Sequence, residues 1–284
     1  MNKTELRDRL QAHLEQVARE RDPYLATAGH FFVQQYITTQ LAQWGTVTTH
    51  TFKRPQATHT NLILDLPGRS PEHTRPILIG AHYDAVPGTP GTDDNATGVA
   101  ALLELARAIA VEPAKYPVRL VAFDLEERGM VGSAAYAQRL KQNGEALRLM
   151  LSLEMLGYCT QAPNSQRYPT EILKRIYPDR GNFIALIGNL PTLPDLQHFC
   201  QAFHQSGVPS RWLPVAGGGE VLPAVRLSDH SSFWDQGYQA MMITDTAFMR
   251  NPHYHESSDR IDTIDFEFFT SVCLGLFRGI QTLR

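Results

Sequence analysis

Short apolar runs alternate with amphipathic helical patterns along most of this 284-residue chain. Three of the runs, 76–82, 118–124 and 148–154, are almost continuously apolar, as strands are when helices cover both faces of a sheet. Further strand patterns lie at 47–52, 61–66, 183–188 and 240–245. Strands that alternate with helices predict an α/β fold, here three α/β/α layers around a central, twisted, mixed and mostly parallel β-sheet.

Amphipathic periodicity predicts helices over residues 3–20, 27–43, 95–111 and 263–282. The first two precede the alternating pattern, so we expect residues 1–284 to form a single domain with an N-terminal helical segment, at about 1–45, packed on it. The helix over 27–43 carries a broad apolar face that includes Phe31 and Phe32.

Two long connections interrupt the alternation, at 158–181 and 206–227. Ordered loops of this length are often functional lids, but a solvent-facing excursion is an equally good interpretation. Arg211 and Trp212 lie in the second connection, where they could line a specificity pocket or anchor an exposed loop.

The charge balance excludes some partners. With 26 basic and 29 acidic side chains, the net charge of −3 argues against a nucleic-acid partner.

No uncharged apolar stretch reaches the ~18 residues of a membrane span, so no membrane partner is expected. The amino-terminal residues have no signal-peptide pattern, and the three cysteines are too few for a disulfide framework. These features predict a cytoplasmic protein.

Metal-ligand residue types follow the three most apolar strands. His82 and Asp84 come after the first, Glu126 and Glu127 after the second, and Glu154 after the third. Because sites in α/β sheets form outside the carboxyl ends of the strands, these side chains should share one polar cup. An isolated pair such as Glu126 and Glu127 could equally be a solvated acidic turn.

Two further segments can close this cup. Asp94 lies in the turn 91–98 before a predicted helix, and Tyr254 and His255 lie in 251–256 after the last predicted strand. Imidazole and carboxylate groups suit zinc, and two histidines with several carboxylates suit a pair of hydrolytic metal ions. Asp94 could bridge such a pair, or it could simply cap the helix.

The order of these motifs resembles that of the co-catalytic zinc aminopeptidases of the bacterial leucyl aminopeptidase type, across about 60–270. That family also contains glutamate carboxypeptidases, glutaminyl cyclases and receptor ectodomains that have lost the metals. The resemblance implies a zinc-exopeptidase fold of the phosphorylase/hydrolase-like kind. It also implies two zinc ions, one held by His82, Asp94 and Glu154, the other by Asp94, Glu127 and His255.

The resemblance assigns catalytic roles as well. Glu126 matches the general base, Asp84 the carboxylate that orients His82, and Tyr254 the phenol that hydrogen-bonds the developing oxyanion. The segment 227–234 resembles a family signature whose Asp229 and His230 support the site. One departure is Glu154, where bacterial aminopeptidases generally carry Asp, and this departure bears on exopeptidase action more than on hydrolysis.

We therefore expect a di-zinc metallopeptidase, an aminopeptidase that acts on peptides. A single-zinc glutaminyl cyclase of the same fold is the first alternative, and metal stoichiometry with product analysis would separate the two. A non-catalytic binding module is the second alternative. It is disfavoured because all the presumed ligands and the base are of competent types, and buried carboxylates are costly without a cation.

Overall fold

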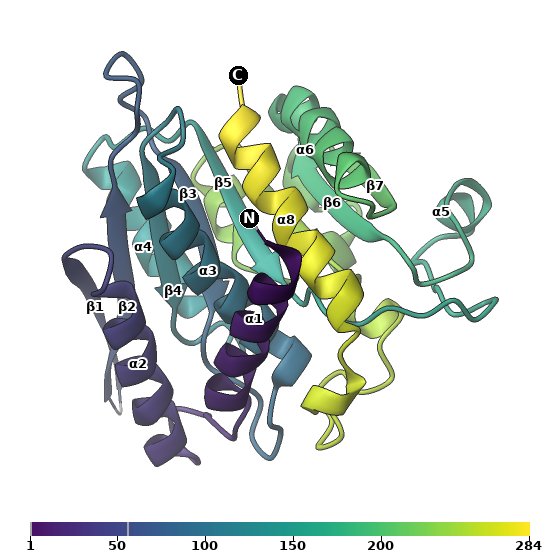
Figure 1. The fold of residues 1–284 in the computed structure, drawn as a ribbon, viewed down its shortest axis with the longest axis horizontal. Coiled ribbons are helices and arrows are strands. Elements are labelled where there is room, and N and C mark those ends of the chain that lie inside the picture. Colours follow the sequence, from purple (N-terminus) through teal and green to yellow (C-terminus); the bar gives the residue numbers. More distant parts are fainter. Residues whose placement is uncertain (1, 56) are drawn as a thin grey trace.

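The computed structural model describes residues 2–55 and 57–284. Eight strands form one sheet in the order β1-β2-β4-β3-β5-β8-β6-β7, with helices on both faces, and this confirms the predicted α/β/α architecture (Figure 1). The strands are β1 Val47–Arg54, β2 Ala57–Leu66, β3 Ile77–His82, β4 Val118–Phe123, β5 Leu149–Glu154, β6 Ile184–Asn189, β7 Ser210–Val215 and β8 Ala240–Thr244.

The helices are α1 Lys3–Val17, α2 Thr27–Leu41, α3 Gly98–Val111, α4 Val131–Gln142, α5 Glu171–Ile176, α6 Leu193–Gln205, α7 His230–Asp235 and α8 Phe266–Thr282. α3 is buried on nearly every side from Gly98 to Ile109, and its alanine- and leucine-rich sequence fits a helix between a sheet and other helices. α8 begins at Phe266, and the side chain of the preceding Asp265 accepts a hydrogen bond from the Phe268 N–H and caps the helix.

Four central strands run in the same direction. β4, β3, β5 and β8 pair in parallel, so their carboxyl ends meet at one edge of the sheet. The β1–β2, β2–β4 and β6–β8 pairs are antiparallel, which makes the sheet mixed. The predicted ligands at the ends of β3, β4 and β5 therefore share this edge.

Two apolar clusters hold the layers together. The larger one joins one face of the sheet to α1, α2, α3, α6 and α8, and the smaller one joins the other face to α4 and α7. α5 lies apart from both layers beyond the β7 side of the sheet (Figure 1). The N-terminal helices are part of the larger cluster through Leu6, Leu10, Val33 and Ile37, all of them buried.

Several local predictions were incomplete or wrong. The connection 206–227 contains the edge strand β7, and the connection 158–181 contains the short helix α5. The helix predicted over 95–111 begins as a π-helical turn, Thr92–Thr97, before α3. Phe31 and Phe32 do not face the core: they are 61% and 39% exposed, and the Arg19 guanidinium lies 3.9 Å from the centre of the Phe32 ring.

Among the described residues, no helix combines the length and the apolar character that crossing a membrane requires.

Candidate metal centre

The sheet brings the candidate residues of three strands to one edge. His82 is the last residue of β3, Glu154 is the last residue of β5, and Glu126 and Glu127 follow β4 after a two-residue link. His82 is fully buried and Glu154 is 7% exposed. Because β4, β3 and β5 are adjacent and parallel, these side chains converge although they are far apart in sequence.

Asp94 faces two histidines with its two carboxylate oxygens. Its Oδ1 lies 3.3 Å from His82 Nε2, and its Oδ2 lies 3.2 Å from His255 Nε2. The π-helical turn that carries Asp94 is fixed by Asp259, whose carboxylate accepts hydrogen bonds from the N–H groups of Asp93 and Asp94. A carboxylate held between two imidazoles in this way has the arrangement that a bridging ligand needs.

The remaining two carboxylates each stand beside one of these histidines. Glu127 Oε2 lies 3.3 Å from His255 Nε2, and Glu154 Oε1 lies 3.6 Å from His82 Nε2. Ser228 donates a hydrogen bond to Glu154 Oε2 at 2.8 Å and so fixes that carboxylate. The structure thus places His82, Asp94 and Glu154 on one side, and Asp94, Glu127 and His255 on the other.

Unpartnered buried atoms test whether this set fits a metal ion. Among the described residues, His82 Nε2, Asp94 Oδ1 and Glu127 Oε1 are buried and find no well-aligned hydrogen-bond partner, although the first two atoms lie 3.3 Å apart. Leaving such atoms unpaired costs about 1–3 kcal/mol each, so they need a ligand. Within the described part of the chain, these three residues each offer one ligand atom, all within 4.8 Å of one another. Nitrogen and carboxylate oxygen are the donors that zinc takes, and the residues therefore fit zinc.

Burial and the close approach of these charged groups shift the pKa values of the candidate residues. Burial raises the pKa of Glu126 well above its usual range, and the carboxylates of Glu154 and Glu127 raise it further. Burial also raises the pKa of Glu127, to about 7. Burial by itself would lower the pKa of His255, but Asp94 and Glu127 outweigh it and raise that pKa to about 10. A divalent cation would compete with these protons for the same atoms.

Asp84 ties two of the strand ends together. Its carboxylate accepts hydrogen bonds from the backbone N–H groups of Glu126 at 3.0 Å and Glu127 at 3.2 Å. Its Oδ1 also lies 3.5 Å from His82 Nδ1, and both side chains are fully buried. Asp84 therefore contacts the backbone of the β4 loop as well as the ring of His82, which is more than the expected role of orienting that ring.

Tyr254 stacks on its neighbour, with its ring 3.7 Å from the ring of His255 between centroids. Burial, followed by the charges of Asp94 and Glu154, raises the pKa of its phenol above the usual range. The hydroxyl therefore stays protonated at neutral pH and can donate a hydrogen bond.

Three residues at the centre have left-handed backbone conformations that only glycine adopts easily. Leu125 (φ 60°) follows β4, Met155 (φ 49°) follows β5, and the third is His255 itself (φ 60°). Such conformations cost about 1–3 kcal/mol each and persist where the surrounding structure holds them, often at functional sites. Leu125 and Met155 directly flank Glu126 and Glu154, and His255 is itself a candidate ligand.

Sequence reasoning missed Arg21, which supports the loops of the centre from behind. This side chain is fully buried. It donates hydrogen bonds to the backbone carbonyls of Tyr83 at 2.9 Å, Pro90 at 2.6 Å, Gly91 at 2.7 Å and Asp94 at 3.3 Å. Arg21 thereby connects the chain after α1 to the segments that carry His82 and Asp94.

Other buried polar groups nearby were also missed. Asp124 is fully buried and lies 2.8 Å from His30 Nε2 and 3.1 Å from His59 Nδ1. His59 is 4% exposed and belongs to this buried polar cluster. The expected supporting residues Asp229 and His230 are fully buried, and His230 contacts the carbonyl of Val225.

A small hollow opens beside the centre. Glu154 and Tyr254 line it together with mostly apolar side chains, among them Ile187, Leu227, Met242, Phe248 and Met249. Its volume is about 60 Å³. An apolar side chain placed here would lie directly beside the candidate ligands, in the arrangement expected of a pocket for one residue of a substrate.

Comparisons with known proteins show which family the chain belongs to. The family model of peptidase family M28 matches residues 61–273. The uncharacterized protein YfbL of Escherichia coli K12 is 38% identical over 213 residues, or 70% of this chain and 64% of that protein. A probable leucine aminopeptidase 1 of Trichophyton verrucosum is 26% identical, over 76% of this chain and 55% of that protein. The chain thus spans between half and two thirds of the length of these two relatives.

Solved structures share the fold. The LapA aminopeptidase of Legionella pneumophila superposes with a TM-score of 0.73 at 19% identity, covering 99% of this chain and 74% of that one. A glutaminyl cyclase of Bacteroides thetaiotaomicron superposes with a TM-score of 0.71 at 16% identity, covering 100% of this chain and 98% of that one. At these identities the likeness establishes the architecture alone.

Proposed function

The chain belongs to peptidase family M28, and on that premise we propose that it is a zinc-dependent aminopeptidase that hydrolyses N-terminal residues from peptides. The observation that carries the proposal is the position of Asp94, whose two carboxylate oxygens lie 3.3 Å and 3.2 Å from the imidazole nitrogens of two different histidines. This arrangement suits two metal ions joined by one carboxylate.

We assign one zinc ion to His82, Asp94 and Glu154, and the other to Asp94, Glu127 and His255. Zinc bound there would supply Lewis-acid chemistry, in that it lowers the pKa of water toward neutrality and polarises a carbonyl group. The unpartnered buried atoms His82 Nε2, Asp94 Oδ1 and Glu127 Oε1 support this assignment.

Three side chains transfer the proton, stabilise the developing negative charge and position the base and ligands. Glu126, whose Oε2 lies 4.0 Å from His82 Nε2, accepts a proton from the attacking water and passes it to the departing amine. Tyr254 donates a hydrogen bond where negative charge develops on the carbonyl oxygen. Asp84 holds the backbone of Glu126 and Glu127 and the ring of His82, so that base and ligands keep their relative positions.

The hollow beside the centre favours a particular first residue. Apart from Glu154, Tyr254 and two threonines, its walls are aliphatic, aromatic or thioether side chains. Burying an apolar side chain there gains about 25 cal/mol per Å² of apolar area removed from water. We therefore expect leucine-, methionine- or phenylalanine-initiated peptides to be cleaved in preference to those that begin with a charged residue.

The proposal is tested by hydrolysis of aminoacyl anilides by purified, zinc-replete protein. We expect cleavage of leucyl anilide, no cleavage of its N-acetylated form, and loss of activity with a chelator. Glu126→Gln should lose at least about 100-fold in kcat, because a positioned general base contributes roughly 10²–10⁴. The variant should still bind zinc, because Glu126 is not among the assigned ligands.

Two results would redirect the assignment. Cleavage of the N-acetylated compound as well would contradict an aminopeptidase, because recognition of a free amine would then be absent. If zinc binds but no anilide is cleaved, peptides that begin with glutamine should be tested for cyclisation, since solved glutaminyl cyclases share this fold.

A further inference from the structure

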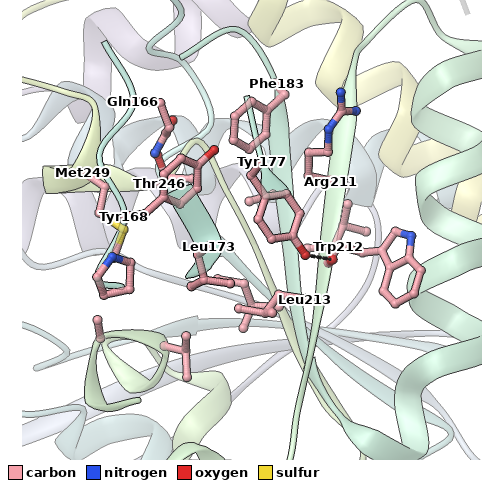
Figure 2. Close-up of a pocket in the computed structure, with 16 residues that line it drawn as sticks. Gln166, Tyr168, Leu173, Tyr177, Phe183, Arg211, Trp212, Leu213, Thr246 and Met249 are labelled. Carbon is pink, nitrogen blue, oxygen red and sulfur yellow. Dashed lines mark hydrogen bonds between the residues drawn. The ribbon is translucent and has the colours of Figure 1, made fainter. Parts of the chain in front are cut away.

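A second hollow, lined by more aromatic side chains, lies next to the hollow that Glu154 and Tyr254 line. It is formed between the segment 166–177, which includes α5, and the strands β6 and β7 (Figure 2). Its walls include Tyr168, Leu173, Tyr177, Phe183, Leu213 and Met249. The volume is about 70 Å³. This is roughly five times the minimum space of about 10–15 Å³ that one water molecule needs, so a side chain of several carbon atoms fits. We call it the aromatic hollow.

The hydroxyl and amide groups of Tyr168, Tyr177 and Gln166 at the aromatic hollow are already paired within the protein. The hydroxyl of Tyr168 donates to the carbonyl of Pro178. The hydroxyl of Tyr177 donates to the carbonyl of Trp212, as Figure 2 shows. The amide of Gln166 is bonded to Thr246 and Arg250. The guanidinium of Arg211 points away from Tyr177 and Trp212 (Figure 2), and its Nη1 donates to the carbonyl of Ser210.

This pairing defines the chemistry of the occupant. A charged or strongly polar group entering the aromatic hollow would lose its water, and the paired hydroxyl and amide groups of Tyr168, Tyr177 and Gln166 would not replace it, which costs several kcal/mol for a charge. An aromatic or branched aliphatic group would instead contact ring faces and aliphatic side chains. The aromatic hollow therefore suits an uncharged apolar side chain.

The two hollows are continuous along one face of the sheet. Ile187, Ala224, Thr246 and Met249 line both of them. Ile187 of β6 is paired with Met242 of β8, at the hollow beside the centre, and with Leu213 of β7, at the aromatic hollow. Paired residues of neighbouring strands project on the same face. The two hollows are therefore offset by about one strand spacing, roughly 4.8 Å.

That offset matches a peptide. Successive residues of an extended chain advance by about 3.3 Å, and alternate residues by about 6.7 Å, so the next apolar side chain of the same molecule can reach the aromatic hollow. An aminopeptidase cleaves after the first residue. If the first side chain lies beside Glu154 and Tyr254, a second one belongs to the part of the peptide that leaves.

We propose that the aromatic hollow binds a large apolar side chain at the second or third residue of the peptide substrate, so that the enzyme prefers peptides with two apolar residues near the amino terminus. This inference rests on the proposed aminopeptidase function. It adds a specificity site built by the 158–181 connection, with Tyr168, Leu173 and Tyr177 as its contribution.

The test compares three peptide amides, Leu-Ala-Ala, Leu-Phe-Ala and Leu-Ala-Phe, with leucyl anilide as the reference substrate. For the unsubstituted zinc-loaded protein, we expect kcat/KM to be at least about tenfold higher for one of the phenylalanine peptides than for Leu-Ala-Ala, because the ring is removed from water. In Leu173→Asp, which places a carboxylate in the aromatic hollow, that ratio should fall to nearly one.

The matched control is Ile172→Asp. Ile172 is the neighbour of Leu173 on α5, is 69% exposed and does not line the aromatic hollow, so this variant should keep the tenfold preference. Leu173→Trp is a second variant that fills the space instead of making it polar, and it should lose the preference too. Circular dichroism of each variant checks that it is folded.

Each outcome decides between the claims. If leucyl anilide is cleaved but neither phenylalanine peptide is preferred, the aromatic hollow is not a substrate site and the proposed function stands. The inference is equally overturned if the preference survives in folded Leu173→Asp and Leu173→Trp. If no substrate is cleaved at all, the proposed function fails and this inference falls with it.

Discussion

Replacing Arg21 by methionine should destabilise the protein strongly, although Arg21 is not among the candidate ligands. Methionine has a similar reach but donates no hydrogen bond. The substitution would leave the buried carbonyls of Tyr83, Pro90 and Gly91, now 2.6–2.9 Å from the guanidinium, without that partner. Because these carbonyls precede or follow candidate ligands, the loops of the metal centre should loosen as well.

The magnitude follows from opposing contributions. A hydrogen bond from a charged group contributes about 1.5–3 kcal/mol net, and three are short here. Removing the buried cation recovers part of its desolvation cost. We therefore expect a loss of about 3–5 kcal/mol in the free energy of unfolding, comparable to breaking other buried charged contacts. Against a typical total of 5–15 kcal/mol, this is a large fraction.

Urea unfolding of the zinc-replete protein, followed by circular dichroism, measures this loss. Arg19→Met is the matched control, since Arg19 stacks on the partly exposed Phe32 at 3.9 Å and should contribute about 1 kcal/mol or less. Arg21→Lys keeps the charge but has fewer hydrogen-bond donors, so its stability should lie between that of the wild type and that of Arg21→Met. A loss below 1 kcal/mol for Arg21→Met, or an equal loss for Arg19→Met, would refute the reasoning.

Three further predictions concern pH, metal and catalysis. Burial alone would raise the pKa of Glu104, but hydrogen bonds from His13, Arg9 and Arg107 outweigh it and lower that pKa to about 2. The ionised carboxylate therefore stabilises the folded state fully above about pH 4.5, and this stabilisation is lost as the pH falls toward 2. Between pH 5 and pH 3, the free energy of unfolding measured with urea should fall by about 2 kcal/mol more in the wild type than in Glu104→Gln. Removing zinc with a chelator should lower Tm by roughly 5–10 °C relative to protein at a free zinc concentration of about 100 Kd, and an unchanged Tm in calorimetry would count against a folded-state metal site. Tyr254→Phe should lower kcat for leucyl anilide by about 100-fold and leave KM nearly unchanged, whereas a KM effect alone would assign the phenol to substrate binding.

The central strands could be predicted from the sequence because burial on both faces leaves an apolar run that is hard to mistake. β3, β4 and β5 are of this kind, and their parallel order brings His82, Glu126 and Glu154 to one edge. The edge strand β7 was missed, because its sequence, SRWLPV, mixes charged, aromatic and proline residues with no alternation. Edge strands tolerate such residues, so periodicity alone does not identify them.

The support of the centre could not be predicted, because it depends on tertiary contacts. Arg21 lies in the charged stretch RERD, which is typical of a solvated surface, yet segments 62 to 73 residues further along the chain enclose it. Asp259 similarly has no local signal, although its carboxylate fixes the turn that carries Asp94. The types and order of the residues in the sequence predicted which side chains form the candidate site. The residues that hold those side chains in place could be identified only from the three-dimensional structure.

The zinc content of the native protein is the most direct test of the central claim. After dialysis against metal-free buffer, mass spectrometry of the metal and the protein concentration together give the number of zinc ions per chain. We predict two ions for the native protein and about one for His255→Ala, which removes a ligand from one of the two assigned sites. One zinc ion or none in the native protein would contradict the two-metal centre.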